Sequence, residues 1–125
     1  MSSLLYPEES YKITGALYAV HRELGPGLME KIYQEALEKE FRLQGIPYER
    51  EKSFVVYYKG ERLENKYIAD YVCYNKIVVE LKAVDNLLPI HTAQVINYLA
   101  ITGYKLGLLV NFNTRVIKPE RIVRL

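Results

Sequence analysis

Three charged side chains stand in apolar, strand-like stretches of this 125-residue chain. Asp70 ends one apolar run, and Glu80 and Lys82 lie inside the next, Ile77 to Ala83. Because successive side chains of a strand point to opposite faces, Glu80 and Lys82 share a face. Burying such charges without partners is costly, so a sequence that places them there is expected to use them.

The position of Asp70 relative to Glu80 depends on the turn between the two runs. A two-residue turn at Asn75-Lys76 would pair Tyr71 with Glu80 and send Asp70 to the other face. A three-residue connection centred on Asn75, or a bulge, would pair Asp70 with Glu80. We favour the second arrangement. Adjacent carboxylates repel one another unless a cation lies between them, and Mg²⁺ prefers oxygen ligands. Lys82 would then orient an attacking water or compensate charge on a phosphate.

The elements that position these residues follow from periodicity and from turn residues. Helical spacing predicts helices over Tyr11–Leu24, with Ser10 as a cap, and over about Leu28–Leu43, closed by Gly45. Strand formers predict Phe54–Tyr58, Arg62–Tyr74 and Ile77–Ala83, followed by a helix from Pro89 to Thr102 that Gly103 ends. Leu106–Phe112 is a further strand, and Arg115–Val123 supplies one at the edge.

This order predicts an α/β fold in which helices flank a mixed central sheet. The crossover through the Pro89 helix is expected to be right-handed and to make the strands at Ile77 and Leu106 parallel neighbours. By length, residues 1–125 form a single domain.

Two further groups of residues are candidates for a site. His91, Gln94 and Tyr98 recur at spacings of three and four and form a polar stripe on the Pro89 helix. Glu30 shares a stripe with Tyr33 and can face the sheet. The same glutamate also fits an ordinary helix start with Gly27 as the N-cap, and the sequence leaves both readings open.

The composition limits the class of protein. The chain has 17 basic and 15 acidic residues, so it lacks the marked basic excess of many nucleic-acid-binding domains, although a local groove stays compatible. Cys73 cannot form an internal disulfide and is expected to be a core residue, which suits a reducing cytoplasm. The N-terminus resembles no signal peptide, and no apolar run reaches the roughly 18 residues of a membrane span. We therefore expect a cytoplasmic protein.

At these positions the chain resembles the PD-(D/E)xK nuclease superfamily, whose restriction-endonuclease-like core has a similar element order. Asp70, then nine residues, then Glu80-Leu81-Lys82 resembles its metal-binding core, and Gln94-Val-Ile-Asn-Tyr98 resembles its QxxxY element. Gly27-Leu-Met-Glu30-Lys-Ile-Tyr33 resembles the signature of the bacterial GxxExxY proteins, a family assigned to this superfamily. The resemblance extends from about Tyr6 to the C-terminus, and Ala69 stands where the superfamily often has proline.

The resemblance implies a metal-dependent nuclease that hydrolyses phosphodiester bonds of nucleic acid, with DNA as the expected substrate. Glu30, Asp70 and Glu80 would hold Mg²⁺ or Mn²⁺, and Lys82 would orient water or stabilise charge. Gln94 would join the catalytic set, and Tyr98, His91 and Tyr33 would position substrate. Paired cuts in a duplex would suggest a homodimer. The alternative is a non-catalytic module of the same fold that binds nucleic acid or a protein partner; a tyrosine-lined small-molecule domain ranks last.

Overall fold

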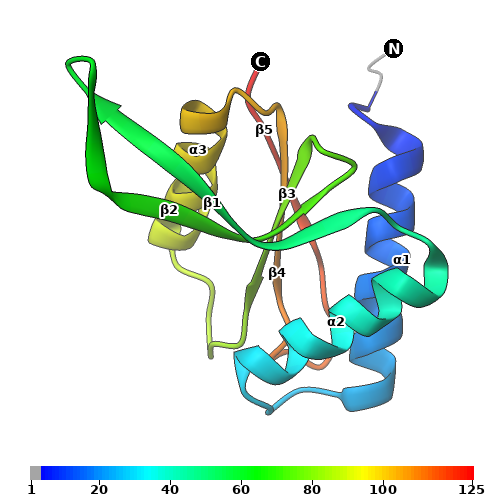
Figure 1. Cartoon of the computed structure of the whole chain (residues 1–125). Helices are drawn as coiled ribbons and strands as arrows, with labels where there is room; N and C mark the ends of the chain where they lie inside the picture. Colours follow the sequence, from blue (N-terminus) through cyan, green and yellow to red (C-terminus); the bar gives the residue numbers. More distant parts are fainter. Residues whose placement is uncertain (1–3) are drawn as a thin grey trace.

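The protein has three helices and five strands in the computed structural model, which describes residues 4–125 (Figure 1). In chain order they are α1 (Pro7–Leu24), α2 (Glu30–Gln44), β1 (Tyr48–Tyr58), β2 (Glu61–Cys73), β3 (Ile77–Lys82), α3 (Pro89–Thr102), β4 (Leu106–Asn111) and β5 (Glu120–Val123). This is the predicted order of elements. No helix among the described residues has the length and apolar character needed to cross a membrane.

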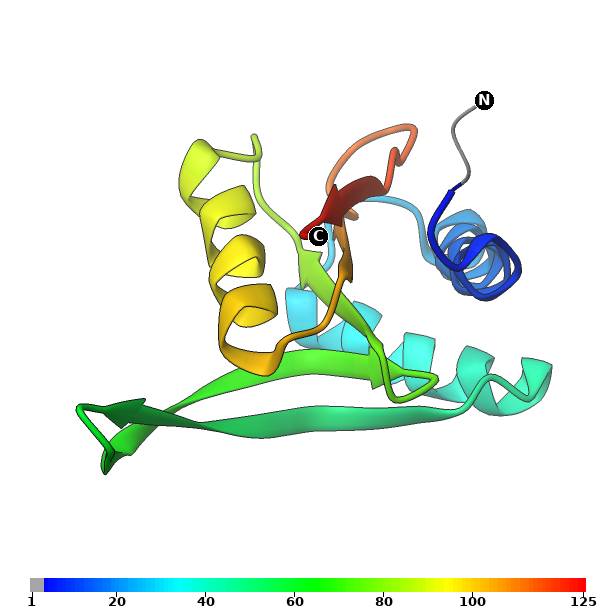
Figure 2. The ribbon, with the colours of Figure 1, turned by 90° about the horizontal axis from the view of Figure 1, so that it is seen from above.

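One sheet with the strand order β1-β2-β3-β4-β5 separates two layers of helices. β3 and β4 are parallel, as predicted for strands joined through α3, and the other neighbouring strands are antiparallel. Helices α1 and α2 cover one face, where Leu17 and Leu37 pack on Tyr71 and Val79 of the sheet. Helix α3 covers the other face (Figure 2). The central strands β3 and β4 are therefore buried on both sides, which explains their continuous apolar runs.

Helix α3 lies very close to the sheet at Gly107 of β4. A Cβ atom at this position would overlap the side chain of Val95. Val95 and Leu99 of α3 are fully buried here against Val78 and Leu109. The missing side chain of Gly107 thus sets the distance between α3 and the strands that carry the charged residues.

The starts of α1 and α2 differ from those that the sequence predicts, whereas α3 begins at Pro89 as predicted. Helix α1 begins at Pro7, because proline suits the first turn, so Ser10 lies inside the helix instead of capping it. Helix α2 begins at Glu30 with Met29 as its N-cap, and Gly27 stands in the preceding loop at φ 98°. The predicted ends are confirmed, since Gly45 and Gly103 adopt left-handed conformations directly after their helices.

The first strand is longer than predicted and the last is shorter. β1 begins at Tyr48, six residues before Phe54, because the exposed Glu49 and Glu51 alternate with half-buried residues along the strand, as in a half-buried strand. β5 covers only the end of the predicted Arg115–Val123 segment. Cys73 is buried and unpaired, as expected, and burial raises the pKa of its thiol to about 12.

Candidate metal and nucleic-acid site

The turn between β2 and β3 decides whether the two carboxylates meet. The pairs Tyr71 with Val79 and Cys73 with Ile77 leave a connection of three residues centred on Asn75. Tyr74 and Asn75 make this turn with positive φ values of 54° and 60°. This register places Asp70 opposite Glu80 on one face, so the predicted three-residue connection is confirmed.

β2 and β3 separate at this pair, and the two carboxylates fill the fork. The backbone pairing ends at Tyr71 and Val79, after which the N–H of Leu81 donates to Oδ2 of Asp70 at 2.8 Å. In return, the N–H of Asp70 donates to Oε1 of Glu80 at 3.1 Å. Beyond the fork, β2 continues with β1 alone (Figure 1). Side-chain oxygens thus accept bonds where the backbone ladder of the sheet stops.

Burial makes it costly for both carboxylates to be ionised together. Glu80 is only 5% exposed, and burial and the neighbouring Asp70 raise its pKa to about 9. Burial also raises the pKa of Asp70, although the N–H of Leu81 and a hydrogen bond from Glu80 oppose this. Without a cation, the pair therefore shares one proton, which Glu80 carries and donates to Asp70.

Lys82, the last residue of β3, supplies the positive charge of the site. It is half-buried, and its ammonium group lowers the pKa of Asp70, Glu80 and Glu30. Among the ion pairs within 4.0 Å that residues 4–125 form, none includes Lys82. The ammonium group therefore acts on three carboxyl groups without being held by one, and it can still pair with an incoming anion.

A groove of about 530 Å³ brings α2 to the carboxylate pair. Its walls include Glu30 and Gln34 of α2, Glu51 and Ser53 of β1, and Ile68 and Asp70 of β2. Burial and the charge of Asp70 raise the pKa of Glu30. Glu30 therefore lies near enough to Asp70 for the two charges to interact. The capping interpretation with Gly27 as the N-cap is wrong, because Met29 is the N-cap and Glu30 is the first residue of the helix, with no side-chain cap hydrogen bond.

Glu51 is a groove residue that the sequence does not reveal. Its φ of 53° is unusual for a residue with a side chain, and its charge raises the pKa of Asp70. The strand that the sequence predicts begins at Phe54, so no predicted element includes Glu51. Its place in a charged segment next to a strand offers no distinguishing signal.

Tyr98 approaches the pair from α3. Its hydroxyl donates to the carbonyl of Ile68 at 2.7 Å, and its ring meets Tyr67 edge-on at 5.0 Å. Burial, followed by the charges of Glu80 and Asp70, raises the pKa of Tyr98. The phenol therefore lies close to both carboxylates and ties α3 to β2.

Three predicted site residues are not brought to the pair. Gln94 is exposed, and among the described residues its side chain has no hydrogen-bond partner. His91 accepts the N–H of Leu88 through Nδ1 at 2.9 Å and so caps α3. Tyr33 is fully buried: its hydroxyl donates to the carbonyl of Gly25 and its ring stacks on Phe112. Tyr33 is therefore a core packing residue and does not line the site.

The donor chemistry of the site suits a hard divalent cation, but its ligands are not fully assembled. Asp70 and Glu80 provide adjacent carboxylate oxygens, and Glu30 lies in the same groove as Asp70. Within residues 4–125, no three His, Cys, Asp or Glu side chains already converge as a metal-binding group. Glu30 would therefore have to rotate toward the pair to complete the set.

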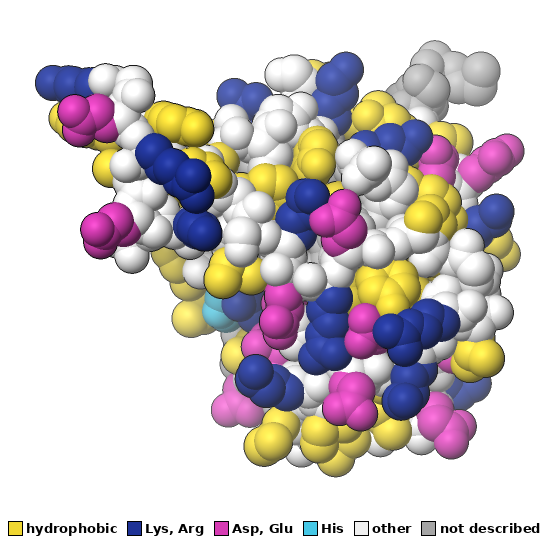
Figure 3. Space-filling model, in the orientation of Figure 1, with side chains coloured by type: hydrophobic (Ala, Val, Ile, Leu, Met, Phe, Trp, Pro, Cys, Tyr) yellow, Lys and Arg dark blue, Asp and Glu magenta, His cyan; other side chains and the backbone are white. Residues whose placement is uncertain are grey.

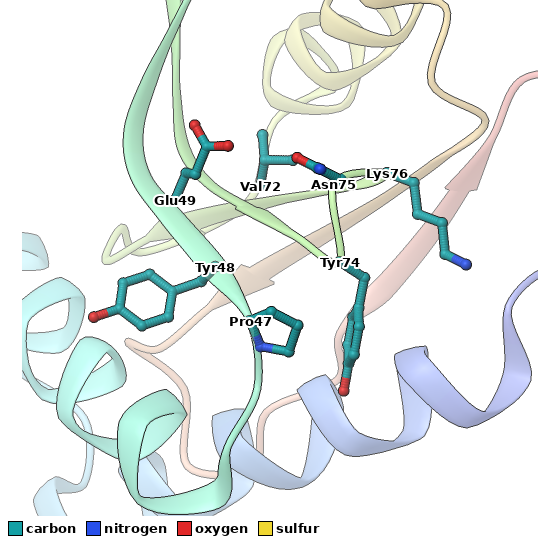
Figure 4. A pocket seen from close by; sticks show the side chains of 7 residues that line it. All are labelled: Pro47, Tyr48, Glu49, Val72, Tyr74, Asn75 and Lys76. Carbon is teal, nitrogen blue, oxygen red and sulfur yellow. The ribbon is translucent and has the colours of Figure 1, made fainter.

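A second groove, of about 480 Å³, lacks such convergence. It lies between the start of β1 and the β2–β3 turn, where Tyr48, Tyr74 and Lys76 point away from one another (Figure 4). Its two charged side chains already have partners, since Glu49 pairs with Lys52 and Lys76 with Glu9. We therefore place the candidate site at the fork.

Comparisons with known proteins agree with this fold. A sequence model described as the PD-(D/E)XK nuclease superfamily matches residues 7–125. The solved structure titled "Crystal structure of SSO0001" is similar at 25% identity and a TM-score of 0.61, over 95% of this chain and 59% of that one. This chain thus spans less than two thirds of that protein. No curated protein sequence matches significantly.

Proposed function

Since the chain belongs to the PD-(D/E)XK nuclease superfamily, we propose that it is a metal-dependent nuclease that hydrolyses phosphodiester bonds in DNA. The observation that carries this proposal is the fork, where Asp70 and Glu80 face each other beside Lys82. We also propose that it belongs to the bacterial GxxExxY branch, on the residues Gly27, Glu30 and Tyr33.

Each residue of the fork has a role that its surroundings support. Asp70 and Glu80 would bind Mg²⁺ or Mn²⁺, with Glu30 as a third ligand, and Glu80 would release its proton on binding. The bound ion supplies Lewis-acid chemistry, which neutralises phosphate charge and acidifies water. Lys82 would orient the attacking water and stabilise negative charge on the phosphate, since its ammonium group is not held in an ion pair among the described residues.

Tyr98 would position Glu80 and the backbone of β2 through its bond to Ile68. Gln94 and His91 would reach substrate from the same helix, because both lie at least partly at its surface. Tyr33 would act only indirectly, by holding the loop before α2 through Gly25 and Leu28. Cutting both strands of a duplex would need two copies of the chain.

A cleavage assay tests the proposal. The purified protein is incubated with single- and double-stranded DNA and RNA in Mg²⁺, Mn²⁺ or chelator. We expect metal-dependent cleavage of DNA, lost by about 100-fold or more in Asp70→Asn and in Glu80→Gln. These amides keep the hydrogen-bond acceptors of the fork, so the variants should fold. Glu49→Gln, on the same sheet, is the matched control and should cleave normally. Cleavage that survives in both fork variants would refute the site.

A non-catalytic module that binds nucleic acid or a protein is the second candidate. It is favoured by the incompletely assembled ligands among residues 4–125 and by the exposure of Gln94. Calorimetric titration with Mg²⁺ and with Mn²⁺ separates the two candidates. The titration is best done at about pH 8, because protons compete less with the metal ion for the two carboxylates at high pH. A folded protein that binds neither ion would support the module.

A further inference from the structure

β1 and β2 continue beyond the fork as a two-stranded ribbon, which we call the arm (residues 52–68). The pairs run from Lys52 with Ala69 to Tyr58 with Glu61, whereas β3 pairs with β2 only from Tyr71 to Cys73. The arm therefore projects from the body of the protein (Figures 1 and 2). The register shifts between Val55 and Tyr57, where β2 has two more residues than β1. Counted along β1 at about 3.3 Å per residue, the arm reaches roughly 20 Å from the level of Asp70 to Tyr57, which pairs with Arg62.

The arm is ordered at both ends. Its tip is a two-residue turn in which Lys59 and Gly60 have positive φ values of 49° and 82°, the geometry of a type I′ turn. At its base, Phe54 meets Tyr104 edge-on at 5.9 Å and Tyr67 meets Tyr98 at 5.0 Å. Such a braced ribbon can bind a partner without first losing much conformational freedom.

One face of the arm continues the groove of the carboxylates. Lys66, Ile68 and Asp70 follow each other at the two-residue spacing of β2, so they share a face. Ile68 is paired with Ser53, and both line the groove with Glu30 and Asp70. A long substrate that reached Asp70 in the groove would therefore pass along Ile68 and Lys66.

The arm carries a local positive charge. Residues 52–68 contain four basic and two acidic side chains, a surplus equal to the formal charge of +2 of the whole chain. Lys59, Arg62 and Lys66 are exposed. Basic side chains are visible along the projecting arm in Figure 3. Tyr57 and Tyr58, near the tip, are 64% and 61% exposed and add polar aromatic surface.

We propose that the arm binds duplex DNA, so that Lys66, Arg62 and Lys59 contact phosphates at increasing distances from the phosphodiester bond that is cleaved beside Asp70. The inference rests on the proposed function, which places the cleaved bond at Asp70. At about 3.4 Å per base pair, the reach of the arm covers roughly six base pairs. The partner is B-form DNA because a two-stranded ribbon fits its major groove, whereas the major groove of A-form RNA is too narrow.

Binding by matched charge variants tests the proposal. The arm variant is Lys59→Ala/Arg62→Ala/Lys66→Ala. The control, Lys12→Ala/Arg22→Ala/Lys118→Ala, removes the same charge from exposed positions on α1 and on the loop before β5. Fluorescence anisotropy with a labelled duplex of about 24 base pairs is measured in chelator at several salt concentrations, and thermal melting checks each fold.

We expect the arm variant to weaken binding to duplex DNA by about 30-fold or more, and the control by less than about threefold. The slope of log affinity against log salt should fall by two to three in the arm variant, roughly 0.9 for each lost phosphate contact. Duplex RNA should be bound more weakly than DNA and show a smaller difference between the variants.

Three results would overturn the inference: an equal loss in the two variants, an equal arm effect on duplex RNA, or wild-type protein that binds no duplex. A change of oligomeric state with unchanged DNA binding would also overturn it, by showing that the arm pairs with a second copy. Because the assay contains no metal, it is independent of cleavage. An arm-dependent binder that never cuts DNA would refute the proposed function alone, and a nuclease whose arm variant binds normally would refute only the arm.

Discussion

The proton shared at the fork predicts that the metal-free protein loses stability as pH rises. The pKa of Glu80 increases from an ordinary 4.5 to about 9 in the folded protein. Between these values the folded chain holds a proton that the unfolded chain has released. The stabilisation is therefore complete below about pH 4.5 and is lost as pH rises toward about 9.

The size of the effect follows from counting protons. A difference of one proton gives a slope of about 1.4 kcal/mol per pH unit, so the free energy of unfolding should fall by about 2.7 kcal/mol from pH 6 to pH 8. In Glu80→Gln, the amide can donate to Asp70 and its oxygen can accept the N–H of Asp70, as protonated Glu80 does. This variant should not show the slope.

Denaturant unfolding in chelator at pH 6, 7 and 8 measures the effect. The informative quantity is the free energy of unfolding of the wild type minus that of Glu80→Gln, since the contributions of all the other titratable groups cancel in it. Glu49→Gln, which changes an exposed carboxylate of the same sheet, should behave like the wild type. A difference that stays constant across this range would refute the shared proton. Added Mg²⁺ at pH 8 should stabilise the wild type more than Glu80→Gln.

Three substitutions test other parts of the fold and site. Lys82→Ala should lower the rate of cleavage by about 100-fold and leave Mg²⁺ affinity in calorimetry within a few-fold, because the ammonium group acts on the phosphate. Tyr98→Phe should cost about 1 kcal/mol in denaturant unfolding, since the carbonyl of Ile68 loses its donor. Gly107→Ala should cost about 1–3 kcal/mol, because the added methyl overlaps Val95, whereas Gly15→Ala, with open space around it, should not destabilise the protein.

The fork is the part of the site that could be predicted from the sequence. Its evidence is local: charged residues in apolar runs, the two-residue period, and a turn whose length decides the register. Asn75 readily adopts the left-handed conformation that the three-residue connection requires. The same period could not show how far β1 extends, because Glu49 to Lys52 have the composition of a loop.

The orientation of α3 could not be predicted reliably for a different reason. This helix is apolar on most of its circumference, so the polar stripe of His91, Gln94 and Tyr98 does not define which side faces the sheet. In the structure, Val95, Tyr98 and Leu99 are buried, while Ile96 and Gln94 are exposed. Only the missing side chain at Gly107, in a distant strand, shows where α3 approaches.

The fork also has an evolutionary consequence. Asp70 and Glu80 each accept an amide from the opposite strand, so the sheet needs an oxygen at both positions, while only the proposed chemistry needs a negative charge. A descendant that abandoned cleavage could exchange both acids for their amides and keep its shape. Homologues that carry asparagine and glutamine at these positions would be lineages that keep the fold but have lost the reaction. Aliphatic residues there would also remove the side-chain oxygens that accept the two backbone N–H groups.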